Sequence, residues 1–224
     1  MNAPVNAVIF DMDGLLLDTE RVALETYLET VAELGIVAGA DLFSNFIGKP
    51  WHTTTELIRE TLQPEDADRM LSRWPETFEA RIDSSGIPKK PGVDALLDLI
   101  ELRQLPVALA TSTSRERTIV QLASVGLDTR FATMATGDEV VNGKPSPDIY
   151  LLAADRLGVD PASCFALEDS NPGVEAASTA GMRVIMVPDL IEPTPELAAR
   201  AECVCRNLEE AREFLHTYLP GGMR

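Results

Sequence analysis

The sequence reads Val8-Ile9-Phe10-Asp11-Met12-Asp13-Gly14 close to its N-terminus, and the predicted fold follows from this stretch. The apolar run from Ala7 to Phe10 is short, contains β-branched residues and ends at polar ones, which predicts a buried strand. Asp11 and Asp13 follow the strand directly, and Gly14 marks a turn. Two acids this close repel each other, so both stay ionised only beside a cation or cationic side chains. We therefore expect a counter-charge elsewhere in the chain, together with a phosphate or carbonyl group on which the acids act.

The composition is that of a soluble globular protein with a substantial core. The chain has 224 residues, enough for one large α/β domain or two smaller ones, and 45% of them are apolar. Its 19 basic and 36 acidic residues give a formal net charge of −17, which argues against nucleic acid or an anionic membrane as a partner. No apolar run approaches the length of a membrane span, so we expect none.

Cysteine usage and the N-terminus both favour a cytoplasmic protein. Three cysteines without a framework spacing are typical of a reducing compartment. The N-terminus lacks the basic segment and the long apolar run of a signal peptide. Cys203 and Cys205 flank Val204 in a predicted strand, and we interpret them as small core residues rather than as a metal site.

Residues 18 to about 87 carry helical signals and no convincing strand. Apolar residues recur at helical spacing between Leu24 and Val31, and Gly35 ends that run. Two further helices are predicted over 52–62 and 64–81, the second with a proline at its start. This block is predicted to be a helical insert.

Strands and helices alternate after residues 88–92, a segment rich in proline and glycine that marks a break in secondary structure. Alternation of this kind predicts a parallel sheet with helices on both faces, a doubly wound α/β fold. The first strand must join the same sheet, because one strand cannot bury itself. We therefore predict an α/β core from 1–16 and 88–224 and an inserted α-helical cap from 17–87. The predicted strands of the second segment span 107–110, 133–135, 164–167, 184–187 and 203–205.

Polar groups follow four of these strands, at the edge where α/β sheets bind ligands. Besides Asp11 and Asp13, they are the cluster 111–114 (Thr-Ser-Thr-Ser), Lys144 in an Asn-Gly-Lys-Pro loop, and the pair Glu168-Asp169. Each has an ordinary explanation: a helix cap, a surface turn, and a helix start where negative charge is favoured. Four such groups with complementary chemistry at successive strand ends favour a functional site instead.

The chemistry that these groups suggest is phosphoryl transfer. Carboxylates from two strand ends form a hard oxygen site suited to Mg²⁺, which keeps water and takes a phosphate oxygen. The hydroxyl and backbone N–H groups at Thr111 and Ser112 could hold other phosphate oxygens, as at other helix N-termini. Lys144 would neutralise a carboxylate and the transferring group.

The ordered set Asp11-Met12-Asp13-Gly14, Thr111, Lys144 and Glu168-Asp169 resembles the four motifs of the haloacid dehalogenase superfamily, and the likeness covers nearly the whole chain. The resemblance implies a Rossmann-like core with a helical cap. It implies Asp11 as the nucleophile that forms an aspartyl-phosphate, and Asp13 as general acid and then general base.

The same resemblance implies the ligands of Mg²⁺ and of the phosphate. Asp11, the backbone carbonyl of Asp13, and Asp169 would hold the cation, with Glu168 as a ligand or beside it. Thr111 and Lys144 would hold the phosphate and orient Asp11.

Within the superfamily the residues favour a phosphatase. Dehalogenases lack the second acid, which is present here as Asp13, and members that cleave carbon–phosphorus bonds need an imine lysine where Trp51 stands. β-Phosphoglucomutase is a closer alternative, but its cap arginine and histidine fall at Trp51 and Ala23. A phosphorylatable receiver domain is a more remote alternative, since receivers are about half this length and have no cap.

We therefore expect a Mg²⁺-dependent phosphatase for a small phosphorylated metabolite, either a sugar phosphate or a phosphoglycolate-like compound. The loop residues Gly48, Lys49, Trp51 and His52 are expected to select the substrate. A monomer or weak dimer is expected.

Overall fold

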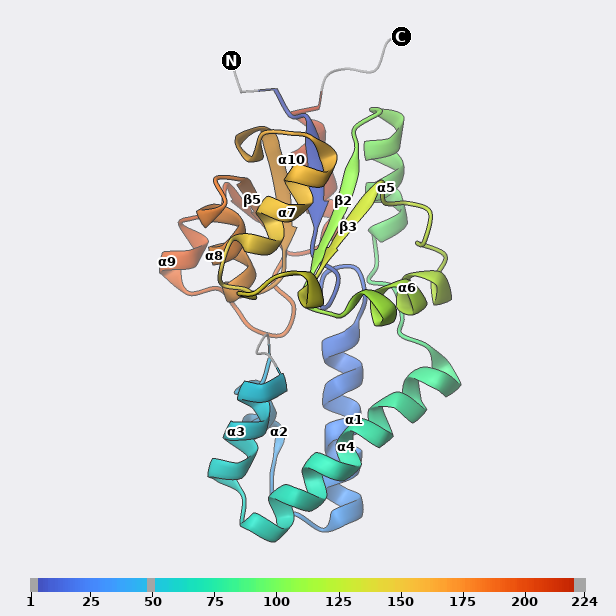
Figure 1. Cartoon of the computed structure of the whole chain (residues 1–224), viewed down its shortest axis with the longest axis vertical. Coiled ribbons are helices and arrows are strands. Elements are labelled where there is room, and N and C mark those ends of the chain that lie inside the picture. The colour runs from blue at the N-terminus through green and yellow to red at the C-terminus, as the bar shows by residue number, and fades with distance from the viewer. Residues whose placement is uncertain (1–3, 48–50, 220–224) are drawn as a thin grey trace. The chain divides into compact units, whose positions relative to one another are not determined.

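The computed structural model describes residues 4–47 and 51–219 and divides the chain into two compact units. One unit joins Met1–Leu17 to Lys89–Arg224, and the other is Asp18–Pro88. Figure 1 shows strands in the first unit and helices in the second. Within the described residues, no helix combines the length and the apolar character needed to cross a bilayer.

The first unit is built on a six-stranded parallel sheet in the order β3-β2-β1-β4-β5-β6. Its central strand β1 is buried along its whole length, as expected of an apolar run covered on both faces. In register, Ile9 of β1 lies opposite Ala108 of β2 and Ala166 of β4. The strands are β1 (Ala7–Phe10), β2 (Val107–Thr111), β3 (Thr133–Thr136), β4 (Cys164–Glu168), β5 (Arg183–Met186) and β6 (Cys203–Val204).

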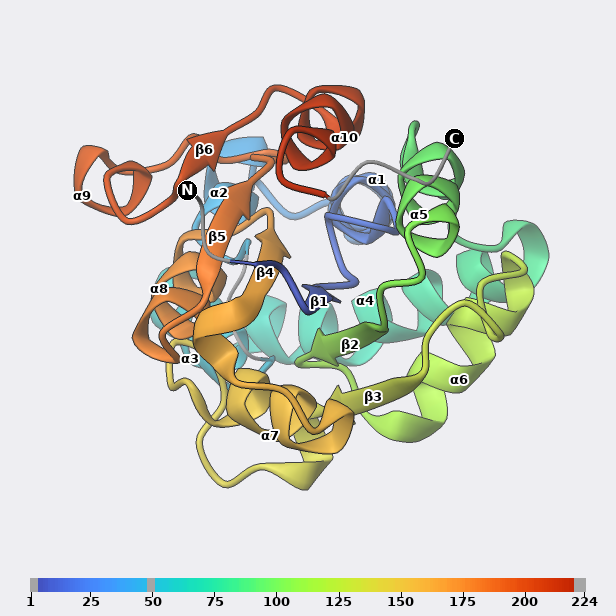
Figure 2. The same cartoon turned by 90° about the horizontal axis from the view of Figure 1, so that it is seen from above.

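Helices cover both faces of this sheet, with α5, α6 and α10 on one face and α7 and α8 on the other (Figure 2). Right-handed crossovers require this arrangement, because the chain moves outward from β1 to β3 and then returns to β4 on the other side of β1. The predicted doubly wound α/β fold is thereby confirmed. The helices are α5 (Val93–Leu102), α6 (Arg115–Ser124), α7 (Asp148–Leu157), α8 (Asn171–Thr179), α9 (Pro195–Ala198) and α10 (Leu208–His216).

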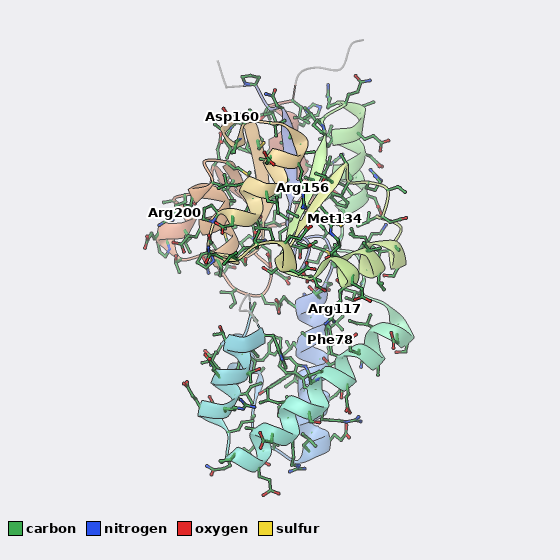
Figure 3. The ribbon with its side chains drawn as sticks, viewed as in Figure 1. Phe78, Arg117, Met134, Arg156, Asp160 and Arg200 are labelled. Atoms are coloured by element: carbon green, nitrogen blue, oxygen red, sulfur yellow. The ribbon has the colours of Figure 1, made fainter. Side chains whose placement is uncertain are left out.

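Small side chains bring α7 and α8 close to the sheet. The core on this side is rich in alanine, including Ala108, Ala110 and Ala166 from the strands. Arg156 near the end of α7 donates to the carbonyl oxygen of Met134 on β3, and both residues can be followed in Figure 3. Close packing over β1 to β3 holds the N-terminal half of α7, which includes Tyr150, against the strand ends.

The second unit consists of α1 (Thr19–Leu34), α2 (Ala40–Ser44), α3 (Trp51–Thr61) and α4 (Pro64–Ser85). An aromatic cluster forms its core: Tyr27 and Trp74 pack edge to face with ring centroids 5.4 Å apart, and Phe43 and Phe46 pack against both. At the surface, ion pairs such as Arg73–Glu33 join α4 to α1. The helical character predicted for this block is therefore present, and a buried aromatic core stabilises it.

The chain leaves the sheet unit and re-enters it through adjacent segments. Leu17 and Lys89 form an isolated antiparallel bridge, and the backbone N–H of Lys90 donates to the carbonyl of Leu16 over 2.9 Å. The outgoing and returning segments are thus hydrogen-bonded to each other at the boundary of the α/β unit.

Candidate active site

The candidate site lies at the carboxyl ends of β1 and β4. The connections from these neighbouring strands lead to opposite sides of the sheet, which makes this the topological switch point where α/β proteins bind ligands. The backbone N–H of Asp11 donates to the carbonyl of Leu167 over 3.0 Å, so the parallel pairing continues into the site. The backbone therefore holds Asp11 beside Glu168 and Asp169.

A buried ammonium group joins the two strand ends. Lys144 Nζ donates to Asp11 Oδ1 and, over 2.6 Å, to Glu168 Oε1, and all three side chains are almost completely excluded from solvent. Lys144 lies in the loop between β3 and α7, far from both partners along the chain. Its ammonium is the counter-charge that the paired acids after β1 require.

Glu168 is fully hydrogen-bonded. Its Oε1 also accepts from the Tyr150 hydroxyl over 2.5 Å, and its Oε2 accepts from the Asp169 N–H and the Ser170 hydroxyl, each over 3.2 Å. Four donors on one carboxylate fix its orientation.

Gly173 in the first turn of α8 makes room for Glu168. A Cβ on Gly173 would lie 1.9 Å from both Oε2 and Cδ of Glu168. Glycine at this position therefore lets the helix start close over the carboxylate, which Ser170 also bonds from the cap position.

Asp13 faces a different set of groups. Its Oδ2 accepts from the Thr113 hydroxyl over 2.7 Å and from the Thr111 hydroxyl over 3.2 Å, and the Thr113 N–H donates to Thr111 Oγ1. Ser112 lies between the two threonines and is exposed, and its carbonyl approaches so close to Gly137 that a Cβ there would lie 2.1 Å away. Asp13 is thus held at the end of β2, partly exposed, while Asp11 is buried.

Burial and neighbouring charge shift the pKa values of the central groups. Burial raises the pKa of Asp11 well above its ordinary value, the Lys144 ammonium opposes this only in part, and Glu168 and Asp13 add to the rise. Burial alone would lower the pKa of Lys144, but the Asp11 and Glu168 carboxylates outweigh it and raise that pKa. Burial, with the Glu168 charge beside it, also raises the pKa of Tyr150, so its hydroxyl stays protonated and donates.

Three buried acids lie next to one another at these strand ends. Asp11, Glu168 and Asp169 are buried, and each offers an oxygen within 4.8 Å of the others. A set of carboxylate oxygens this close together is the donor set of a hard divalent cation such as Mg²⁺. The Asp13 side chain is not part of this group, because it turns to the threonines.

The structure brings six of the predicted site residues to one edge of the sheet, and Ser112 adjoins them. They are Asp11, Asp13, Thr111, Lys144, Glu168 and Asp169. Of the predicted selection residues, Gly48, Lys49 and the side chain of His52 lie outside the described residues. Trp51 is 50% exposed at the start of α3, and its ring lies 5.6 Å from that of Trp74.

Sequence reasoning missed two side chains of the site, Thr113 and Tyr150. Thr113 lies in the hydroxyl cluster after β2, but only the fold shows that its hydroxyl reaches Asp13. Tyr150 is in the apolar stripe of α7 and carries no local signal of a polar role. Its position six residues after Lys144, across the start of a helix, could have suggested that both face one site.

The strand-end acids, the buried lysine and the hydroxyl cluster define a hydrolase of the haloacid dehalogenase type. Residues 8–187 match the family model described as haloacid dehalogenase-like hydrolase, and the chain belongs to this family.

Relatives with assigned activities agree with this class. The chain is 36% identical over 181 residues to a phosphorylated carbohydrates phosphatase of Thermotoga maritima, covering 81% of this chain and 84% of that protein. The predicted phosphoric monoester hydrolase of the haloacid dehalogenase superfamily is thereby confirmed.

Solved structures share the whole fold. A Thermotoga maritima protein assigned as a β-phosphoglucomutase superposes with a TM-score of 0.80 at 32% identity, covering 96% of this chain and all of that one. CbbY from Rhodobacter sphaeroides, solved with phosphate, gives a TM-score of 0.72 at 29% identity and covers 92% of this chain and 96% of that one.

We predict that Gly173→Ala destabilises the protein by about 1–3 kcal/mol, the usual range for overpacking a buried site. Helix propensity alone would favour alanine by about 1 kcal/mol, so a net loss reports the clash with Glu168. Urea unfolding of the two proteins measures the difference. Gly143→Ala is the control, because no atom lies within 4 Å of its Cβ position, and equal stability of both variants would contradict the steric role.

Proposed function

We propose that this protein is a Mg²⁺-dependent phosphatase that hydrolyses a small phosphomonoester, a sugar phosphate or a phosphoglycolate-like metabolite, through an aspartyl-phosphate. The observation that carries the proposal is the buried Lys144 ammonium between Asp11 and Glu168, with Asp169 beside them. The named activity of the Thermotoga maritima relative, on phosphorylated carbohydrates, supports the substrate class.

In the first step, a carboxylate oxygen of Asp11 attacks phosphorus, and the ester bond to the leaving oxygen breaks. Asp13 gives that oxygen a proton, so the product leaves as an alcohol. Lys144 and the Thr111 hydroxyl neutralise and hold the phosphoryl oxygens, with the backbone N–H of Ser112. The Thr111 and Thr113 hydroxyls both donate to Asp13 Oδ2, so we assign the proton transfer to Oδ1.

In the second step, Asp13 takes a proton from water, whose oxygen attacks the aspartyl-phosphate. The bond between phosphorus and Asp11 breaks, which releases inorganic phosphate, regenerates the Asp11 carboxylate and leaves Asp13 protonated for the next turnover. The buried Lys144 stays protonated throughout, because the adjoining carboxylates raise its pKa. Its charge therefore stabilises the negative charge that develops in both steps.

The cation would be held by Asp11, Asp169 and the backbone carbonyl of Asp13, with Glu168 bound to it or beside it. When bound, Mg²⁺ supplies positive charge that lets an anionic carboxylate approach an anionic phosphate. Because Glu168 already accepts four hydrogen bonds, its main role is to hold Lys144 and the start of α8 in place.

We also propose that the helical insert at 17–87 selects the substrate. Trp74 is buried in the core of this insert, whereas Trp51 is 50% exposed. We assign selection of the substrate to this residue together with Gly48, Lys49 and His52.

Phosphosugar mutase activity is the second candidate, supported by the likeness to the β-phosphoglucomutase-assigned structure. A mutase must hold two phosphates, but Trp51 and Ala23 occupy the positions where the sequence comparison places its cap arginine and histidine. Water is therefore the favoured acceptor.

A panel of phosphorylated metabolites, assayed with Mg²⁺ and with EDTA, tests the proposed reaction. We expect phosphate release with Mg²⁺ only, and Asp11→Asn lowers kcat by roughly 10⁴-fold or more, the scale of loss when a nucleophile is removed. Activity that survives chelation or Asp11→Asn would refute the mechanism. Isomerisation of glucose 1-phosphate with a bisphosphate primer, faster than phosphate release, would select the mutase.

The variant Asp13→Asn tests whether Asp13 donates the proton to the leaving oxygen. We expect kcat to fall by about 10²–10⁴-fold on alkyl phosphates, whose alcohols leave poorly without a proton. The loss should be much smaller for formation of the aspartyl-phosphate from an activated aryl phosphate, measured as the product burst under rapid mixing. Equal loss on both substrates would count against this role.

Stability against pH tests the cation site independently of turnover. Because burial raises the pKa of Asp11, the folded protein binds more protons than the unfolded one above the ordinary carboxyl pKa, and metal-free stability falls as pH rises there. Mg²⁺ favours the ionised carboxylate, so we expect it to raise Tm more at pH 8 than at pH 5. Thermal unfolding measures this. A Mg²⁺ shift that is equal at both pH values, or is retained in Asp11→Asn, would contradict the prediction.

A further inference from the structure

One buried carboxylate near the site has no role in the mechanism above. Asp189 follows β5, its side chain is 4% exposed, and its Oδ1 accepts from Lys90 Nζ. Its other oxygen, Oδ2, is buried and finds no hydrogen-bond partner among the described residues. An unpaired buried carboxylate oxygen is costly, so in a native site it indicates a group that binds beside it.

Asp189 Oδ2 and Asp169 share the space over Gly14. From the point where a Cβ on Gly14 would lie, Asp169 Oδ2 is 2.1 Å away and Asp189 Oδ2 is 3.5 Å away. Gly14 has φ +82°, in the left-handed region, so glycine both permits the turn after Asp13 and leaves this space open. Asp189 therefore borders the carboxylate group of Asp11, Glu168 and Asp169, although it is not a member of it.

Lys90 fixes Asp189 to the segment that carries the nucleophile. Its backbone N–H donates to the carbonyl of Leu16, six residues after Phe10 at the end of β1, while its ammonium binds Asp189. The pair adds an oriented acceptor at the site without adding net charge. An unpaired acid there would instead repel Asp169.

We propose that Asp189, held by Lys90, is a positioning residue of the cation site. Its Oδ2 accepts hydrogen bonds from water carried by the ion that Asp11 and Asp169 hold. This inference rests on the proposed Mg²⁺ site. Mg²⁺ keeps several waters when bound to proteins, and partners outside the direct ligands commonly change metal affinity by about 10–100-fold.

Calorimetric titration of Mg²⁺ into the metal-free full-length protein tests the inference without relying on turnover. We expect Asp189→Asn to weaken Mg²⁺ binding by about tenfold or more, with an unchanged far-UV spectrum. The Mg²⁺ concentration that gives half-maximal phosphatase activity should rise by a similar factor.

The matched control is Glu202→Gln. Glu202 forms a partly buried ion pair with Arg183 over 2.6 Å in the same unit, where β5 adjoins β6, so its variant should bind Mg²⁺ like the wild type. Asp169→Asn removes a proposed ligand and should abolish binding.

A second variant keeps the test valid if Asp189→Asn fails to fold, since that substitution removes the carboxylate that Lys90 binds. Lys90→Met with Asp189→Leu removes the pair without leaving a buried charge. It too should weaken Mg²⁺ binding about tenfold. If this double variant, and Asp189→Asn where it folds, bind within threefold of the wild type, the role of Asp189 is overturned while the proposed function stands. If the wild type itself binds no Mg²⁺, both fail together.

Discussion

The structure of this site depends on a single buried ammonium group. Asp11 and Glu168 end neighbouring strands, and both are removed from water, where two carboxylates cannot remain charged side by side without compensation. Lys144 supplies that compensation from a loop more than a hundred residues after Asp11. Its ammonium links the two strand ends, and the three carboxylates gathered there are the physical reason to expect a divalent cation.

Glycines decide how closely the other groups can approach this centre. Gly173 admits the Glu168 carboxylate under the first turn of α8, Gly137 admits the carbonyl of Ser112, and Gly14 leaves the space that Asp169 and Asp189 border. In each case the missing side chain brings backbone or carboxylate oxygen where a Cβ would clash. The site therefore depends on these glycines as well as on its charged residues. A larger residue at any of the three positions would clash with a neighbouring oxygen, although it removes no charge.

The two units differ in what holds each of them together. The strand ends of the α/β unit carry the charged groups, and the family match over residues 8–187 spans both units. The helical unit has its own aromatic core around Trp74 and leaves Trp51 half exposed. A phosphorylated carbohydrates phosphatase and a structure assigned as a β-phosphoglucomutase both resemble this chain, so the fold alone does not name the reaction.

The sheet, the helical block and most of the charged residues were predictable from local patterns, because they depend on periodicity and on residues that directly follow predicted strands. Asp11, Asp13, Lys144, Glu168 and Asp169 could be placed at one edge since parallel strands end together. Their hydrogen-bond partners were not predictable in this way and are seen only in the folded chain. Thr113, Tyr150 and Asp189 reach the site from a helix start, an apolar helix stripe and a loop, and their roles depend on distances across the fold, which no local pattern encodes.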